Sequence, residues 1–231
     1  MSQAAPMKII ARIRTDFPTK FGIPRQSGLV EELRGQIVFE PEYRSPDALR
    51  GLEGFSHIWL LWQFSQSVRE SWSPTVRPPR LGGNERLGVF ATRSPFRPNP
   101  IGLSCVRLDR VELQTKEGPT LVVSGADLMD GTPIFDIKPY LPYVDSRPEA
   151  QGGFASAKPE GGLTVDIPPA LLERLPQDLR APLRGVLSCD PRPSYQNDPQ
   201  RVYGLDFGGY NIKFTVDGQQ LTVRAIEGSH P

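Results

Sequence analysis

LSCVRLDRVELQTKEGPTLVVSGADLMDGTPIFDI, residues 103–137, contains three short apolar runs in close succession. They are Leu103–Leu113, Thr120–Asp127 and Pro133–Ile137, and polar residues with Gly or Pro separate them. Short runs rich in Val, Ile, Leu and Phe between turn residues are typical of β-strands. This segment therefore predicts three consecutive strands.

The same pattern extends along the whole chain of 231 residues, in which 25 prolines and 22 glycines are scattered rather than clustered. They interrupt nearly every possible long helix, so the chain is predicted to be mainly β. One short helix is expected to start at Ser45, where Ser-Pro-Asp supplies an N-cap, a proline at the first helical position and an early acid. The other candidate strands before residue 100 are Lys8–Arg14, Gln36–Phe39, His57–Phe64 and Leu87–Ala91.

A change of composition marks a boundary at residues 145–162, DSRPEAQGGFASAKPEGG, which are small, polar and rich in Pro and Gly. We expect a main domain over 1–145, a linker or loop over 146–162 and a small α+β C-terminal domain over 163–231. In the last part, leucines near helical spacing are interrupted at Pro176 and Pro182, which predicts two short helices. The expected strands there are Arg201–Asp206, Asn211–Val216 and Gln220–Ile226, the last two joined by an Asp217-Gly218 turn.

Charge and cysteine content restrict the class of protein. Lys and Arg total 27 against 26 Asp and Glu, so any contact with nucleic acid must depend on a local patch. Cys105 and Cys189 lie far apart without metal-ligand spacing, which fits a reducing cytosol and predicts no metal site. The N-terminus lacks an apolar signal core, and Phe55–Phe64 is too short to span a bilayer. We expect a soluble cytoplasmic protein with no membrane contact.

Residues Thr75–Leu103, TVRPPRLGGNERLGVFATRSPFRPNPIGL, carry five arginines against the single acid Glu85. Prolines and glycines prevent these arginines from sharing a helix face, and each guanidinium offers a rigid fork suited to carboxylates and phosphates. We interpret the segment as the anion-facing wall of an active site. Its arginines are Arg77, Arg80, Arg86, Arg93 and Arg97.

The common nucleotide and metal motifs are missing from the sequence: G-x-G-x-x-G after a strand, G-x-x-x-x-G-K-[ST], H-E-x-x-H and C-x-x-C. His57 lies in an apolar run, where a core or pocket-edge histidine is commoner than a catalytic one. The loop FGIPRQSG, residues 21–28, offers Arg25 and Gln26 as hydrogen-bonding side chains. An ordinary solvated turn would look the same.

Two further clusters carry polar side chains. Asp136, Lys138 and Tyr140 would share one face of a strand, since side chains alternate with period two. An acid, a cation and a phenol suit the guidance of a proton and the binding of an anion, although a solvated face with an Asp-Lys pair has the same pattern. In CDPRPSY, residues 189–195, Arg192 and Tyr195 are suited to RNA phosphate or base stacking, or else to a structural turn.

Four motifs of the sequence are GLEGFSHIWLLW, TVRPPRLGGNERLGVFATRSPFRPNPIGLS, DLMDGTPIFDIKPYLP and DPRPSY. Together they resemble the TrmO proteins of the TsaA-like family, which are S-adenosylmethionine-dependent tRNA methyltransferases. The first three are in order and correctly spaced over residues 7–145, and the fourth matches the smaller C-terminal part of bacterial members. The resemblance implies a single β-barrel core with short helices, a homodimer, and methylation of N6 in N6-threonylcarbamoyladenosine beside the anticodon of threonine tRNA.

The resemblance also implies positions that bind S-adenosylmethionine. They map onto Pro24, Arg25, Gln26, Ser65, Gln66, Arg93, Leu103, Ser124, Gly125, Ala126 and Asp127. For the methyl transfer, our hypothesis is that Asp136 or Tyr140 accepts or relays the N6 proton. The carbamoyl and carboxylate groups of the substrate would be held by Lys138, Arg97 and Asn99. Contacts with tRNA are expected from Arg77, Arg80, Arg192 and Tyr195.

Two other functions remain open from the sequence. A non-catalytic β-barrel that senses S-adenosylmethionine or a nucleotide and contacts RNA would need residues 24–26 and Arg93, but neither Asp136 nor Tyr140. A purely structural dimer would pair its arginines with acids across the interface. An assay for methyl transfer to tRNA distinguishes these functions from the enzyme.

Overall fold

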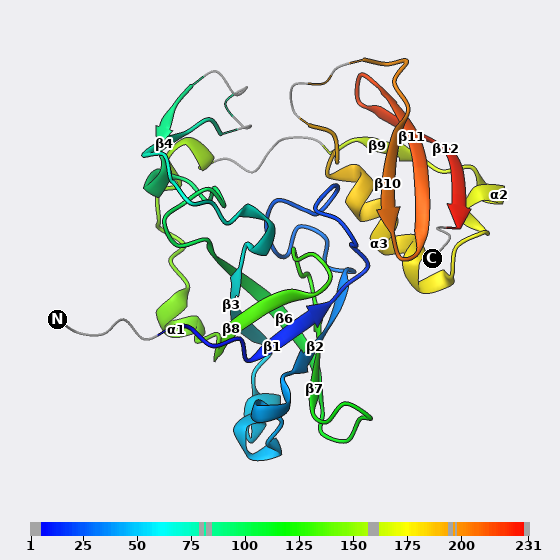
Figure 1. Cartoon of the computed structure of the whole chain (residues 1–231). Coiled ribbons are helices and arrows are strands. Elements are labelled where there is room, and N and C mark those ends of the chain that lie inside the picture. The colour runs from blue at the N-terminus through cyan, green and yellow to red at the C-terminus, as the bar shows by residue number, and fades with distance from the viewer. Residues whose placement is uncertain are drawn as a thin grey trace.

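The computed structural model describes residues 6–78, 81, 85–156, 162–193, 196 and 198–228, and it contains two β bodies (Figure 1). The first part of the chain forms a closed barrel, and the last part forms a four-stranded sheet with two helices. A short ribbon of β4 (Thr75–Val76) and β5 (Leu87–Gly88) is separate from both sheets. The prediction of a mainly β chain with a barrel core, short helices and a small α+β part is confirmed.

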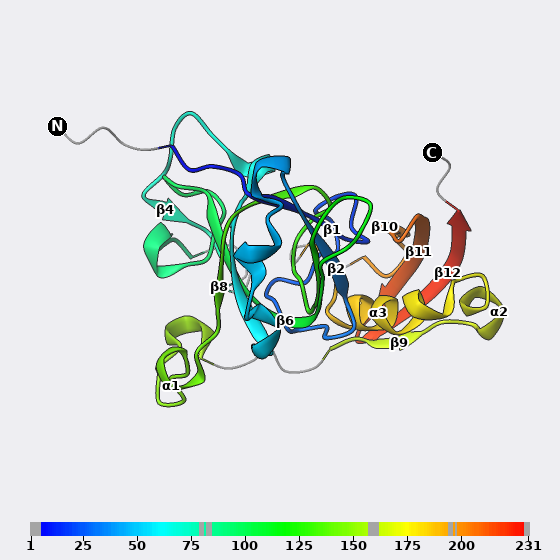
Figure 2. The same ribbon diagram turned by 90° about the horizontal axis from the view of Figure 1, so that it is seen from below.

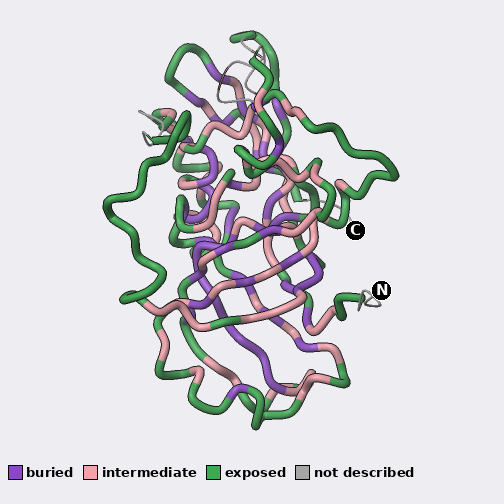
Figure 3. The backbone as a smooth tube through the Cα atoms, turned by 90° about the vertical axis from the view of Figure 1, so that its left-hand side faces the viewer, coloured by how far each residue is buried: buried purple, intermediate pink, exposed green. Residues whose placement is uncertain are grey.

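Six strands close the barrel in the order β1-β2-β7-β6-β3-β8, and every neighbouring pair is antiparallel. Closure removes the free sheet edges that would otherwise pair with other chains. Figure 3 shows buried segments where the strands cross and exposed segments in the outer loops. The strands are β1 (Ala11–Arg14), β2 (Arg34–Phe39), β3 (His57–Gln63), β6 (Ile101–Glu112), β7 (Thr120–Ser124) and β8 (Thr132–Pro139).

The sequence of β3 explains how the barrel acquires its core. Ile58, Leu60 and Trp62 are buried, whereas Trp59 and Leu61 between them are more exposed, as expected for a strand with one face inside. The inward side chains of all six strands form one apolar cluster. Its fully buried members include Ala11, Ile13, Ile37, Ile58, Leu60, Leu121, Val123, Leu128 and Ile134.

Three long connections share one mouth of the barrel. Because neighbouring strands are antiparallel, β1, β3 and β7 end at the same mouth at which β2, β6 and β8 begin. The connections at this mouth are residues 15–33, 64–100 and 125–131. Sequence motifs that lie far apart along the chain are therefore brought to one end of the barrel.

The C-terminal sheet has the order β10-β11-β12-β9, in which only β9 is parallel to its neighbour. The long helix α3 lies between this sheet and the barrel in both Figure 1 and Figure 2. Among the described residues no helix is long and apolar enough to cross a membrane. The elements of this part are β9 (Thr164–Asp166), α2 (Pro169–Leu172), α3 (Gln177–Ser188), β10 (Tyr203–Phe207), β11 (Tyr210–Asp217) and β12 (Gln220–Gly228).

The short helix expected to start at Ser45 is observed as a 3-10 helix of four residues, Pro46–Leu49, but the Ser45 side chain makes no capping hydrogen bond. The expected break at Pro182 is wrong, because α3 continues through this residue. The hydrogen bond that Pro182 cannot make would involve the carbonyl of Asp178, which lies in the exposed first turn where water can bond it. The buried proline ring instead adds to the packing of the helix.

Three predicted strands are shorter than expected by three residues each. β1 begins at Ala11 rather than Lys8. β7 ends at Ser124 rather than Asp127, because Gly125 turns the chain with φ of 76°. β5 covers only Leu87–Gly88, and the next three residues form a 3-10 helix. The segment expected as a linker begins at the end of α1 (Pro142–Asp145) and includes residues 157–161, which lie outside the described part of the chain.

Candidate functional site

Three side chains from the three connections meet at the mouth of the barrel. Arg93 donates a hydrogen bond from Nη1 to Oε1 of Gln26, which joins the 64–100 connection to the 15–33 connection. The positive charge of Arg93 also acts on the carboxylate of Asp127, in the 125–131 connection. The structure thus brings together three of the predicted cofactor residues.

Asp127 is held from inside the barrel by a chain of two hydrogen bonds. Ser104 donates to Oδ1 of Asp127 at 2.6 Å, and Trp62 donates from Nε1 to the Ser104 hydroxyl at 2.9 Å. Burial raises the pKa of Asp127, while its hydrogen bonds from Ser104 and the Ser27 backbone and the charge of Arg93 act in the opposite direction. The site therefore contains an oriented, partly buried carboxylate next to a guanidinium.

Two glycines allow the connections to approach each other. The Gly28 N–H donates to the Gly125 carbonyl at 2.9 Å, and the Gly125 N–H donates to the Leu33 carbonyl at 2.8 Å. Gly28 and Gly125 both have φ of 76°, and a Cβ on Gly125 would lie 3.3 Å from the Cα of Gly28. Any larger residue at Gly125 would strain this frame, which sets the position of Asp127.

The remaining predicted cofactor positions are distributed more widely. Pro24 and Ala126 are buried, whereas Arg25 is exposed beside Gln26. Ser65 and Gln66 lie in an exposed 3-10 turn that follows β3 at the same mouth. Two positions point elsewhere: Leu103 is on the outer face of β6 with 56% of its surface exposed, and the buried Ser124 hydroxyl donates to Asp109.

The predicted catalytic face of β8 is observed, but it extends away from the mouth. Lys138 and Asp136 form an ion pair at 2.9 Å on the outside of the barrel. Tyr140 packs beside Trp59 and His57, with ring centroids 5.8 and 6.2 Å away. At a rise of about 3.3 Å per residue, Tyr140 lies about 13 Å along the chain from Asp136. A single chain therefore does not place both proposed proton acceptors at one point.

Arg97 and Asn99 are in the 64–100 connection at the mouth. Arg97 donates from Nη1 to the carbonyl of Thr92 at 3.2 Å, and the Asn99 carbonyl accepts from the Ile101 N–H at 2.7 Å as β6 begins. Within the described part of the chain, neither Arg93 nor Arg97 forms an ion pair with a carboxylate. Their charges remain available to an anionic ligand.

The arginines predicted to contact tRNA have different surroundings. Arg77 is exposed beside β4, and Arg80 lies outside the described residues. Arg192 is nearly buried, with 9% of its side chain exposed, and it forms two hydrogen bonds with Asp190 at 2.8 and 2.9 Å. This geometry favours a structural turn at Arg192, while Tyr195 lies outside the described residues.

Several neighbours of the site were not singled out from the sequence. Ser104 and Trp62 both point into the barrel, and strand alternation alone was the signal that could have found them. In the same connection as Arg93, the Arg69 guanidinium lies 3.8 Å from the centroid of the Phe96 ring. An arginine that covers an exposed aromatic ring gives this rim a flat cationic surface.

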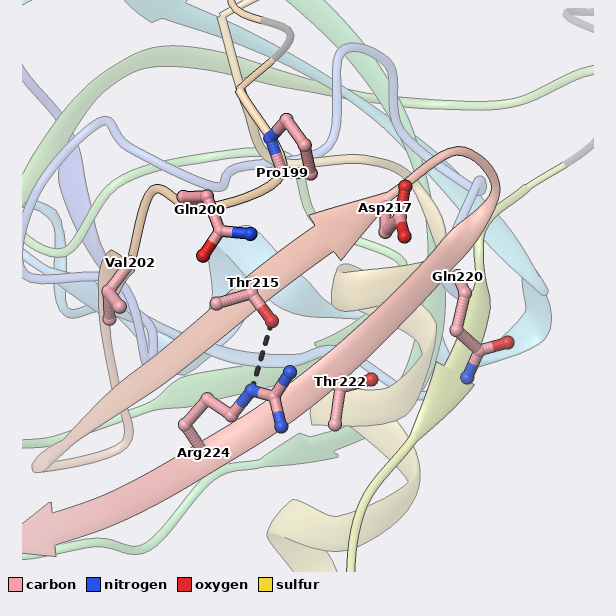
Figure 4. Close-up of a pocket in the computed structure, with 8 residues that line it drawn as sticks. All are labelled: Pro199, Gln200, Val202, Thr215, Asp217, Gln220, Thr222 and Arg224. Carbon is pink, nitrogen blue, oxygen red and sulfur yellow. Dashed lines mark hydrogen bonds between the residues drawn. The ribbon is translucent and has the colours of Figure 1, made fainter.

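A pocket of about 530 Å³ lies away from the mouth, on the outer face of the C-terminal sheet (Figure 4). Arg224 donates from Nε to the Thr215 hydroxyl at 3.0 Å in this pocket. Most of the residues that line the pocket are polar, and none of them is a predicted site residue. The lining residues are Pro199, Gln200, Val202, Thr215, Asp217, Gln220, Thr222 and Arg224.

Comparison with known proteins identifies the family of this chain. The model of the tRNA-methyltransferase O N-terminal domain matches residues 12–146, and the TrmO C-terminal domain model matches residues 165–229. An Escherichia coli relative named tRNA (adenine(37)-N6)-methyltransferase is 43% identical over 227 residues, covering 94% of this chain and 96% of the relative.

Two Pseudomonas aeruginosa proteins are also similar. A relative named putative S-adenosylmethionine-dependent methyltransferase RcsF is 44% identical over 204 residues, covering 85% of this chain and 86% of the relative. A crystal structure of TrmO superposes with a TM-score of 0.79 at 35% identity, covering 99% of both chains. The chain, with its barrel and its C-terminal sheet, belongs to the tRNA-methyltransferase O family.

Proposed function

We propose that the chain is an S-adenosylmethionine-dependent methyltransferase that modifies N6 of adenine 37 in tRNA. Its family and the name of its Escherichia coli relative support this activity. The observation that carries the proposal for this chain is the meeting of Gln26, Arg93 and Asp127 at one mouth of the barrel. We further infer that the adenine carries an N6-threonylcarbamoyl group, that the tRNA is specific for threonine, and that the reaction takes place in the cytoplasm.

The residues at the mouth fit the chemistry of the methyl donor. Its amino acid part carries a carboxylate, which suits Arg93 and Gln26, while its ammonium and ribose hydroxyls are donors that suit Asp127. A partly buried carboxylate with a raised pKa gains from such donors, because they stabilise its charged form. When bound, S-adenosylmethionine supplies a methyl group on a positively charged sulfur.

The protein's part in the transfer is to orient N6 and to remove its proton. Arg97, Asn99 and Lys138 are proposed to hold the carbamoyl and carboxylate groups, and such positioning can supply a large part of the rate. Either Asp136 or Tyr140 would accept the proton. Asp136 is nearer the mouth, and its carboxylate lies 2.9 Å from the Lys138 ammonium on the same face of β8.

We propose that the active form is a homodimer. The ring centroids of Trp72 and Phe90 lie 6.1 Å apart, and 52% and 72% of these residues' surfaces are exposed. Phe90 lies within the arginine-rich segment, and Trp72 lies just before it. Exposed aromatic side chains in contact are typical of a surface that another protein covers. Tyr195, Arg77 and Arg80 are proposed to contact the tRNA, whereas the pairing of Arg192 with Asp190 favours a structural role for that arginine.

Methyl transfer is tested directly with donor labelled in the methyl group and tRNA that carries or lacks the threonylcarbamoyl group. We expect label only in the carbamoylated tRNA, in its adenosine next to the anticodon. Donor retention without transfer to RNA would contradict the enzyme and support a binding module. Failure to retain donor would contradict both.

The proton acceptor is tested with Asp136→Asn and Tyr140→Phe, each assayed at saturating donor. Loss of turnover in one variant with unchanged donor affinity identifies the acceptor. If both variants keep full turnover, neither side chain has the proposed role.

A further inference from the structure

The apolar residues of the 15–33 connection are buried in the C-terminal core rather than in the barrel. Phe17, Val30 and Leu33 belong to the buried cluster formed by α3 and the C-terminal sheet, and Phe21 and Ile23 pack against it. The buried cluster of the barrel contains no residue of this connection. A segment that begins and ends on the barrel therefore buries its apolar side chains against the other body, although its backbone also hydrogen bonds to residues 125–131 of the barrel.

The contact between the two bodies is close and specific. The rings of Phe17 and Phe207 meet edge to face with centroids 5.2 Å apart, and the Gly208 N–H donates to the Asp16 carbonyl at 2.8 Å. A Cβ on Gly185 of α3 would lie 2.5 Å from Cγ1 of Val30. The missing side chain at Gly185 thus provides the space that Val30 occupies.

The same connection determines the geometry of the proposed donor site. Gln26 accepts from Arg93, and the Ser27 backbone acts on the Asp127 carboxylate by lowering its pKa. The Gly28 N–H donates to the Gly125 carbonyl, and the Gly125 N–H donates to the Leu33 carbonyl. Residues 15–33 contain no helix or strand, so this conformation depends on packing rather than on its own hydrogen-bond ladder.

We propose that the C-terminal core is a brace that holds residues 15–33 in the conformation in which Gln26 and Ser27 meet Arg93 and Asp127. Val30 and Phe17 are positioning residues, since they act on the site through the backbone between them. The inference rests on the proposed function insofar as the mouth binds S-adenosylmethionine. Loosening the brace lowers the fraction of molecules whose site can bind the donor. The apparent donor affinity falls in proportion to that fraction.

Val30→Ala tests the brace, and Val216→Ala is its matched control. Both valines are buried in the same cluster, with 3% and 1% of their surfaces exposed. Ile212 of β11 pairs with Leu205 of β10. Val216 lies about 13 Å further along β11 from Ile212, near the end of that strand. Both changes remove the same atoms from the C-terminal core, but only Val30 is part of the connection.

We expect Val30→Ala to raise the dissociation constant and the KM for S-adenosylmethionine about five-fold or more, with kcat at saturating donor within about two-fold of wild type. Hydrogen exchange of the Gly28 and Gly125 amides should be about ten-fold faster. Val216→Ala should lower the midpoint of unfolding without these effects. Equal changes in donor affinity and exchange in the two variants would overturn the proposal.

A second pair of variants keeps the test independent of general destabilisation. Gly185→Ala forces a methyl group against Val30 and should weaken donor binding, whereas combining it with Val30→Ala should restore affinity towards wild type. A double variant no better than either single change contradicts the brace. If the wild-type chain binds the donor but transfers no methyl group, the proposed function is contradicted, whereas donor affinity and amide exchange still test the brace proposal. If the wild-type chain binds no donor, amide exchange alone tests the brace proposal.

Discussion

The Asp127→Asn substitution should make the cofactor-free protein more stable at neutral pH while it weakens donor binding. Burial raises the pKa of the Asp127 carboxyl above its ordinary value of 3.8. Asparagine has nearly the same shape and still accepts the hydrogen bond from Ser104, but it has no charge to desolvate. The gain in stability should therefore depend on pH.

The sign and size of this dependence follow from proton binding. Below pH 3.8 the carboxyl is protonated in both the folded and the unfolded protein. As the pH rises, the unfolded chain releases this proton first, so the free energy of unfolding of the wild type decreases until the folded pKa is passed. Each unit by which the folded pKa is raised contributes about 1.4 kcal/mol to this decrease. The asparagine variant lacks this contribution.

Urea unfolding of both proteins, after dialysis to remove ligand, measures the difference between about pH 3.5 and about pH 8. We expect the free energy of unfolding of Asp127→Asn minus that of wild type to increase with pH over this range, since the folded pKa of Asp127 is raised by burial. Loss of the charged hydrogen bond should raise the KM for the donor about ten- to hundred-fold, since such bonds contribute about 1.5–3 kcal/mol. A stability difference that is flat or decreases with pH would refute the reasoning.

Three other substitutions test separate parts of the site. Ser104→Ala should lower the free energy of unfolding by about 1–3 kcal/mol, because the Trp62 N–H loses its acceptor inside the barrel. Urea unfolding measures this change, and an unchanged free energy would mean that water replaces the hydroxyl. Gly125→Ala should cost about 1–2 kcal/mol, since φ of 76° is strained for alanine and its Cβ meets Gly28; a normal affinity for donor in this variant would show that the frame is adaptable. Arg77→Ala should weaken tRNA binding and reduce the slope of log affinity against log salt by about 1; filter binding at several salt concentrations measures the slope, and an unchanged slope argues against a phosphate contact.

Local sequence pattern predicted most strands because one strand face is buried in a barrel. β3 has the alternation expected of His57–Phe64, and its bounds differ from the prediction by one residue. At Pro182 a non-local effect decided the outcome. Pro182 does not end α3: its ring is buried, and Asp178, whose carbonyl loses the Pro182 donor, lies in the exposed first turn. Such burial is not visible in the sequence around a proline.

The candidate site was only partly predictable for a related reason. Period-two alternation correctly placed Asp136 and Lys138 on one face, where they form an ion pair. Residues on one strand face are still separated by about 3.3 Å per residue along the strand. Tyr140 can therefore share a face with Asp136 without lying at the same site. Which residues meet Asp127 depends instead on where separate connections leave the barrel, and that follows from the order of the strands.

The conformation of residues 15–33 shows most clearly what local sequence leaves undetermined. Phe17, Phe21, Ile23 and Val30 have neither helical nor strand spacing, so their pattern predicts that they are buried but not what buries them. The residues that bury them come after the barrel in the sequence. The packing role of Gly185 is apparent only in the structure, where Val30 occupies the space beside it. A site residue such as Gln26 therefore owes its position to a core formed by distant parts of the sequence. It follows that substitutions in α3 far from any donor contact should change donor affinity, and that their effect depends on contact with this connection rather than on burial alone.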